Sequence, residues 1–162
     1  MRNLLFSLAV VLASPAFGLS CLPPDIASDF KYANDSEDIW VVVEGTVRFD
    51  EKKLPKVNMK RQDKTPPHTD IPARFKGKSL SDTGFDRRFE TPITLRIQCF
   101  GPWCGGASSG ANYLTFLKKE KGSYVMMADP CGGMTYPGGS DDLRKKVLSC
   151  FQGKACDSEP LR

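Results

Sequence analysis

Residues 103–133, WCGGASSGANYLTFLKKEKGSYVMMADPCGG, carry the clearest structural signal in this chain. Residues 113–117 and 123–128 are two apolar runs of strand length, and the polar segment KKEKG lies between them. Two such runs joined by a short polar segment that contains glycine are typical of a β-hairpin. The stretch therefore predicts a hairpin flanked by Cys104 and Cys131, each followed by two glycines.

Further strands are predicted upstream of this hairpin. Residues 38–50, DIWVVVEGTVRFD, contain a β-branched run interrupted by Gly45, which predicts a strand bent at the glycine. Residues 72–81, PARFKGKSLS, alternate weakly, whereas residues 90–100, ETPITLRIQCF, alternate strongly between apolar and polar side chains. We expect the second of these to be a half-buried strand. One face of it holds Ile93, Leu95, Ile97 and Cys99.

Helical signals are scarce in the sequence. Residues 53–72, KLPKVNMKRQDKTPPHTDIP, predict a short strand with Val57 and Met59 as anchors, followed by a loop. Only one helix is expected. Ser140 is a good N-cap, an acidic first turn follows it, and apolar residues then recur at helical spacing. This helix should end near Cys150. Several strands, many turn residues and one late helix indicate a mostly β fold, a small antiparallel barrel or sandwich with an appended C-terminal helix.

The N-terminus resembles a secretory signal peptide. Arg2 is followed by the apolar run LLFSLAVVLA and by small residues suited to cleavage. Cleavage after Gly18 would leave residues 19–162 as a single domain, with a short flexible tail after about residue 156. Cleavage after Ser20 would leave Cys21 as the N-terminus, and lipidation of that cysteine is disfavoured because Gly18 occupies a position where a large aliphatic residue is usual. No segment is long and apolar enough to span a bilayer, so the protein is expected to be periplasmic or secreted.

The six cysteines all follow the apolar run. An even number of cysteines in an oxidising compartment predicts a disulfide framework, although sequence alone does not fix the pairing. Two of the spacings, Cys99 to Cys104 and Cys150 to Cys156, enclose short turn-like segments. The stretch WCGG has the start of a thioredoxin-type site but lacks a second cysteine at position 107, where Ala107 stands. We therefore expect structural disulfides rather than redox chemistry.

Other site chemistries find little support. The net charge of +4 is small, and a loose basic cluster between Lys52 and Lys64 has no interleaved aromatics, so a solvated loop is favoured over nucleic-acid binding. His68 is the single histidine and lies in a proline-rich loop, and no segment offers the nucleophile and the orienting group that a histidine base would need. The sequence thus predicts no catalytic residues, no bound metal and no cofactor.

Taken together, Cys21 close behind the signal peptide, the strand WVVVEGTV, the segment RFKGKSL and above all residues 103–133 resemble the netrin-like module. This module is the OB-fold barrel shared by tissue inhibitors of metalloproteinases and the C-terminal domains of netrins and complement proteins. The resemblance implies an OB-like barrel whose N-terminal segment is held by a disulfide from Cys21 to Cys131 or Cys104. The simplest full set that it implies is Cys21 with Cys131, Cys99 with Cys104, and Cys150 with Cys156.

The chain also departs from the inhibitors of that family. They begin with Cys-x-Cys, and the amino group and carbonyl of the first cysteine chelate the zinc of the protease, whereas here a single Cys21 precedes Leu22, Pro23 and Pro24. An N-terminal Leu19-Ser20 extension would also occupy the space needed by the zinc. Because of these departures, metalloprotease inhibition through an N-terminal Cys21 is an alternative hypothesis and not the favoured one.

The favoured hypothesis is an exported, non-catalytic and monomeric module that binds a protein or a small ligand. Loops on a rigid barrel are common binding elements, and the glycine-rich loop CGGMTYPGG holds Met134 and Tyr136. With Trp103 and Leu22 they form the candidate binding surface. A purely structural role at the cell envelope is the second alternative.

Overall fold

The computed structural model describes residues 18–158. The expected signal peptide therefore lies outside the described residues, except for Gly18. The first three strands are β1 (Trp40–Phe49), β2 (His68–Ser81) and β3 (Gly84–Phe100). They form an antiparallel meander in which β2 pairs with both neighbours.

The predicted hairpin is present. Strands β5 (Asn112–Glu120) and β6 (Ser123–Ala128) pair in antiparallel register, with Glu120 opposite Ser123. The two turn residues, Lys121 and Gly122, both have positive φ, at 46° and 83°. Positive φ at both central positions matches the right-handed twist of the strands in a two-residue hairpin.

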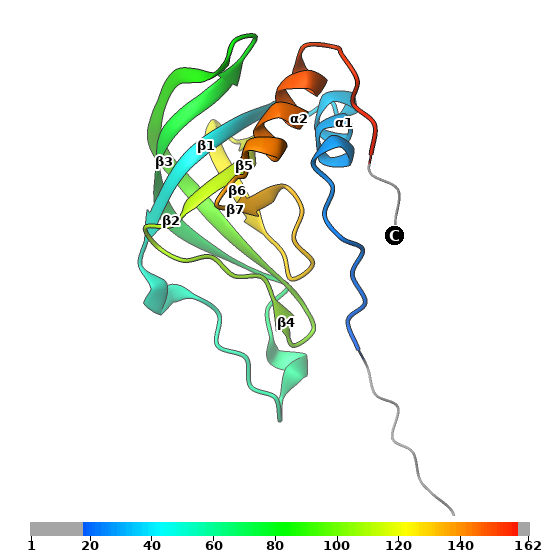
Figure 1. The fold of residues 1–162 in the computed structure, drawn as a ribbon. Helices are drawn as coiled ribbons and strands as arrows, with labels where there is room; N and C mark the ends of the chain where they lie inside the picture. The colour runs from blue at the N-terminus through cyan, green and yellow to red at the C-terminus, as the bar shows by residue number, and fades with distance from the viewer. Residues whose placement is uncertain (1–17, 159–162) are drawn as a thin grey trace, which may run out of the picture.

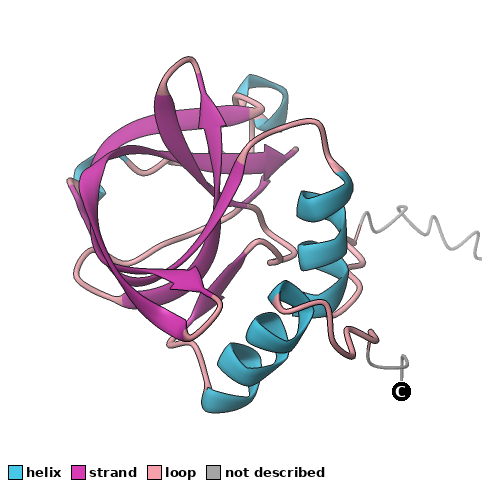
Figure 2. Cartoon of the chain, turned by 90° about the horizontal axis from the view of Figure 1, so that it is seen from above, coloured by secondary structure: helices cyan, strands magenta, loops and turns pink. Residues whose placement is uncertain are grey.

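Two further pairings close these strands into a barrel. β6 runs parallel to β3, and β5 pairs antiparallel with β1, so the order β1-β2-β3-β6-β5 returns to β1. Figure 2 shows the strands curving around this ring. The fold is the predicted mostly β, OB-like barrel, with one parallel pair among its antiparallel neighbours.

Two short strands lie off the ring. β4 (Trp103–Cys104) folds back on the end of β3, and β7 (Thr135–Pro137) adds to β5. Because β3 and β6 are parallel, the turn after β3 and the loop after β6 emerge at the same end of the barrel.

Two helices pack together on one side of the barrel (Figure 2). α2 (Asp141–Phe151) is the predicted C-terminal helix, and Ser140 caps it by accepting a hydrogen bond from the Leu143 N–H. α1 (Ile26–Asp35) was not expected from the sequence. The Asp25 side chain caps it by accepting from the Ser28 N–H at 2.7 Å, and its apolar side packs against α2 and β1.

The segment between β1 and β2 differs from the prediction. Only two 3-10 turns, η1 (Glu51–Lys53) and η2 (Gln62–Lys64), interrupt an otherwise irregular loop. The strand expected around Val57 and Met59 does not form. Met59 is 65% exposed, so its side chain gains no burial from a neighbouring strand.

The core has two parts. One fills the barrel, and the other lies between the barrel and the helices. The predicted apolar face of β3 contributes its four residues to the buried set, each at most 6% exposed: Ile93, Leu95, Ile97 and Cys99.

Three disulfides link Cys21 with Cys131, Cys99 with Cys104, and Cys150 with Cys156. These are the pairs of the simplest set implied by the resemblance. They join the N-terminal segment to the loop after β6, β3 to β4, and α2 to the segment that follows it. Between residues 18 and 158, no helix has both the length and the apolar composition needed to cross a membrane.

Candidate functional site

The N-terminal segment lies on the surface beside the loop that follows β6. The Cys21–Cys131 disulfide joins them, and residues 21–24 are all exposed, with Leu22 at 72%. A Cβ atom added to Gly132 would lie 3.4 Å from Pro24 Cγ, so loop and segment are in contact. Leu22 is therefore held at the surface by its neighbours while its own side chain faces solvent.

Asp29 of α1 forms hydrogen bonds with residues that follow β6. Its Oδ2 atom accepts hydrogen bonds from the Met134 N–H at 2.6 Å and from the Tyr136 hydroxyl at 2.5 Å. Met134 adopts a positive φ of 54°, a conformation that is uncommon for a residue with a side chain. The two bonds to one carboxylate therefore help to hold a strained turn in place.

Tyr136 is buried, contrary to the expectation that it lies on an exposed surface. It lies on β7 opposite Leu114 of β5 and is only 6% exposed, within the core beneath the helices. Burial, together with the adjacent Asp29 carboxylate, raises the pKa of its hydroxyl. A three-residue strand gives no detectable alternation, so the sequence carried no sign of this pairing.

Met134 is half-buried and packs against the core beneath the helices. Its carbonyl accepts hydrogen bonds from the Phe116 N–H at 2.8 Å and from Thr115 Oγ1 at 2.9 Å. Its main contribution is to fix the loop against β5, so it forms at most the edge of a binding surface.

Trp103 is exposed at the turn after β3. It pairs with Phe100 across the short β3–β4 ladder, next to the Cys99–Cys104 disulfide, and the two aromatic residues are 37% and 47% exposed. Phe100 was not among the predicted site residues, although its place directly after Cys99 in an alternating strand puts it on the outer face.

The turn that carries Trp103 contacts the same loop as the N-terminal segment does. A Cβ atom on Gly105 would lie only 2.1 Å from the Ala128 carbonyl oxygen, so the backbones touch there. Segments 21–24 and 100–105 therefore both pack against residues 128–132. We call this end of the barrel, which carries the exposed Leu22, Phe100 and Trp103, the disulfide end.

The exposed side chains of this end are apolar and aromatic. All six cysteines are in disulfides, so none is a free thiol. In the part of the chain that the structure describes, no three or more His, Cys, Asp or Glu side chains are grouped so as to hold a metal ion. His68 is exposed at the first position of β2.

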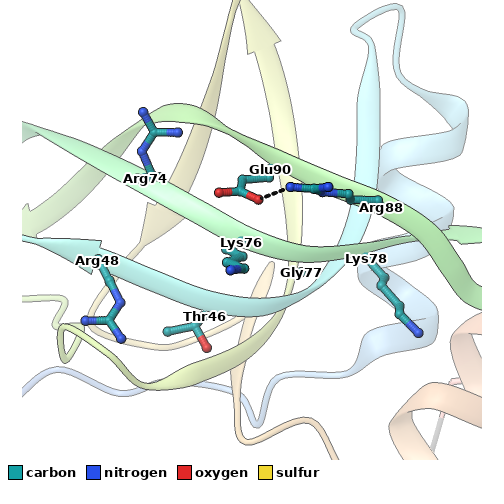
Figure 3. A pocket seen from close by; sticks show the side chains of 8 residues that line it. All are labelled: Thr46, Arg48, Arg74, Lys76, Gly77, Lys78, Arg88 and Glu90. Atoms are coloured by element: carbon teal, nitrogen blue, oxygen red, sulfur yellow. Dashed lines mark hydrogen bonds and ion pairs between the residues drawn. The ribbon is translucent and has the colours of Figure 1, made fainter.

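A second surface was missed by sequence reasoning. The outer face of β1, β2 and β3 has a hollow of about 400 Å³. Figure 3 shows the side chains that line it. Five cationic side chains line it, and we call this surface the basic face: Arg48, Arg74, Lys76, Lys78 and Arg88. In the sequence, the alternation of Arg74, Lys76 and Lys78 along one strand was the available signal.

Comparison of the chain with known protein families, with curated proteins and with solved structures found no match.

Proposed function

We propose that this chain is an exported, non-catalytic, monomeric binding module that recognises a protein partner through the disulfide end. The observation that carries the proposal is the anchoring of exposed apolar groups on a rigid frame. Leu22, Phe100 and Trp103 expose between 37% and 72% of their surface, while two disulfides hold the segments that bear them. Pre-ordered apolar and aromatic anchors lose little conformational entropy on binding, which favours affinity.

The backbone of the N-terminal segment adds to this surface. Among the described residues, Cys21 and Leu22 make no hydrogen bond between backbone groups, and both lie outside regular secondary structure. Free N–H and C=O groups on a fixed exposed segment can pair with the backbone of a partner, as in strand addition. The proline pair at residues 23–24 stiffens the segment without adding donors.

Site-specific photo-crosslinking in the exporting cell tests this proposal. A photoreactive amino acid at Leu22 or at Trp103 should give one adduct of the same mass. Met59 is the matched control, because it is 65% exposed but lies in the loop after β1. Replacing both Cys21 and Cys131 by serine should abolish the adduct at position 22. Equal adducts at all three positions, or none at 22 and 103, would contradict a partner at the disulfide end and favour a purely structural role.

Metalloprotease inhibition is the second candidate, and one observation favours it. Cys21 is exposed and is tied by its disulfide to the loop after β6, as the resemblance to tissue inhibitors of metalloproteinases would require. The exported protein should then begin at Cys21, and an added N-terminal residue should remove inhibition of a zinc protease. An exported chain that begins at Leu19, or one that leaves the protease fully active, would exclude this function.

A further inference from the structure

We propose that the basic face binds an anionic polysaccharide, a linear sugar polymer that carries sulfate or carboxylate groups. This inference is independent of the disulfide end. Strands β1, β2 and β3, which carry this face, lie side by side in the barrel (Figure 1), and the residues of the face line a hollow of about 400 Å³. The arrangement of its cations indicates this class of ligand.

The cations form a row on β2, with one further arginine on each of the two neighbouring strands. Arg74, Lys76 and Lys78 alternate along β2, so their side chains leave the same face of the sheet at intervals of about 6.6 Å. Arg48 lies opposite Arg74 on β1, and Arg88 lies opposite Lys78 on β3. Figure 3 shows Lys76 between these two pairs. A row about 13 Å long exceeds the size of one small anion and suits a chain with repeated charges.

The face contains one acidic residue, Glu90, which lies opposite Lys76. Its carboxylate accepts a hydrogen bond from Arg88 at 2.8 Å. That bond, with the charges of Lys76 and Arg74, lowers the pKa of Glu90. The cations therefore already act together on a carboxylate placed among them, which is the chemistry proposed for the ligand.

The neighbouring acids are paired elsewhere. Glu44, opposite Lys78 on β1, forms an ion pair with Arg144 of α2. Asp70, at the start of β2, forms a 2.8 Å ion pair with Arg96. Neither carboxylate is left to neutralise the row.

Other partner classes fit this surface less well. No aromatic side chain lines the hollow, so bases of a single-stranded nucleic acid would find nothing to stack on. None of the large exposed apolar residues lies among its lining residues. The hollow therefore has neither the apolar side chains that insert into a membrane nor the apolar centre of a protein interface. Arginine side chains, by contrast, can donate two parallel hydrogen bonds to a pair of oxygens of one carboxylate or sulfate group.

The test is titration calorimetry of the exported protein with heparin, a sulfated polymer, and with polygalacturonate, which carries carboxylates only. Binding to at least one polymer is expected, and it should weaken by at least tenfold between roughly 0.05 M and 0.3 M salt because the contacts are solvent-exposed. The triple variant Arg74→Gln, Lys76→Gln, Lys78→Gln should weaken binding by about threefold for each charge, or roughly thirtyfold. Glu90→Gln should tighten binding, an outcome that loss of folding cannot imitate.

A charge-matched variant provides the control. Lys31→Gln, Lys119→Gln, Lys154→Gln removes the same charge from exposed positions outside the hollow and should retain most of the affinity. Failure of both polymers to bind, or equal losses in the two triple variants, would overturn the proposal. Equal or tighter binding of single-stranded DNA, or binding to phosphatidylglycerol vesicles that depends on the same row, would replace it with a different class of partner.

Discussion

Gly77→Ala should strongly destabilise the barrel, because Gly77 touches the backbone of the neighbouring strand. Gly45 and Gly77 lie opposite one another in the β1–β2 pair. A Cβ atom on Gly77 would lie 2.0 Å from the Glu44 carbonyl oxygen and 2.6 Å from Gly45 Cα. Neither glycine has a positive φ, so the cost arises from this contact and not from backbone conformation.

The magnitude follows from the distance. An ordinary contact between these atoms needs about 3.4 Å, so the strands would have to separate locally by roughly 1.4 Å. Such a shift breaks the flanking backbone hydrogen bonds, and losing two of them costs roughly 2 kcal/mol. Overpacking adds about 1 to 3 kcal/mol. We expect the free energy of unfolding to fall by about 3 to 5 kcal/mol, a large part of the stability of a small domain.

Urea unfolding of the exported protein, followed by circular dichroism, measures this change. Gly106→Ala is the matched control, because nothing lies within 4 Å of a Cβ there and φ is not positive. It should be neutral or should stabilise the protein by about 0.4 to 1 kcal/mol, through the unfolded state. A free energy of unfolding for Gly77→Ala within about 1 kcal/mol of that of the control would show that the strands accommodate the added methyl group at little cost.

Three other changes test the disulfide end and its supports. Replacing Cys21 and Cys131 by alanine opens a loop with a sequence separation of 110 and should lower the free energy of unfolding by up to about 5 kcal/mol; unchanged urea midpoints would show that the bond constrains little. Tyr136→Phe removes a hydrogen bond to the half-buried Asp29 carboxylate and should cost about 1 to 3 kcal/mol by calorimetry, whereas no loss would mean that water replaces the hydroxyl. Burial raises the pKa of Asp129, so its contribution to stability is present at low pH and is lost as the pH rises through that raised value. Asp129→Asn should remove this loss. A difference in the free energy of unfolding between variant and wild type that stays constant from about pH 3 to pH 7 would count against this prediction.

Much of the barrel could be predicted from alternation and turn chemistry. The β5–β6 hairpin and the inner face of β3 depend on local patterns that tertiary contacts reinforce. The helix α1 was not predicted, although Asp25 is a good N-cap and the buried Ile26 and Ala33 lie on one helical face. The strand expected around Met59 does not form, because none of the strands in the described part of the chain lies where it could pair with this segment.

The candidate surfaces were less predictable because they depend on which segments meet. Leu22 and Trp103 are exposed, but Tyr136 is part of the core because β7 pairs with β5. The basic face draws residues from three strands, up to 40 positions apart in the chain at Arg48 and Arg88. Only the barrel register brings such residues together, so charge counted along the sequence could not reveal them.

The long disulfide also imposes an order on oxidation. A chain that emerges N-terminus first presents Cys21 to Cys99 and Cys104 before Cys131 appears, since the native partner follows 110 residues later. Cys99 and Cys104 lie only five residues apart and can close their own bond early. If that local bond forms first, it removes the two competitors, and Cys21 remains reduced until the barrel is complete. The short crosslink would then protect the long one from mispairing, and where it fails, thiol–disulfide exchange must correct the error.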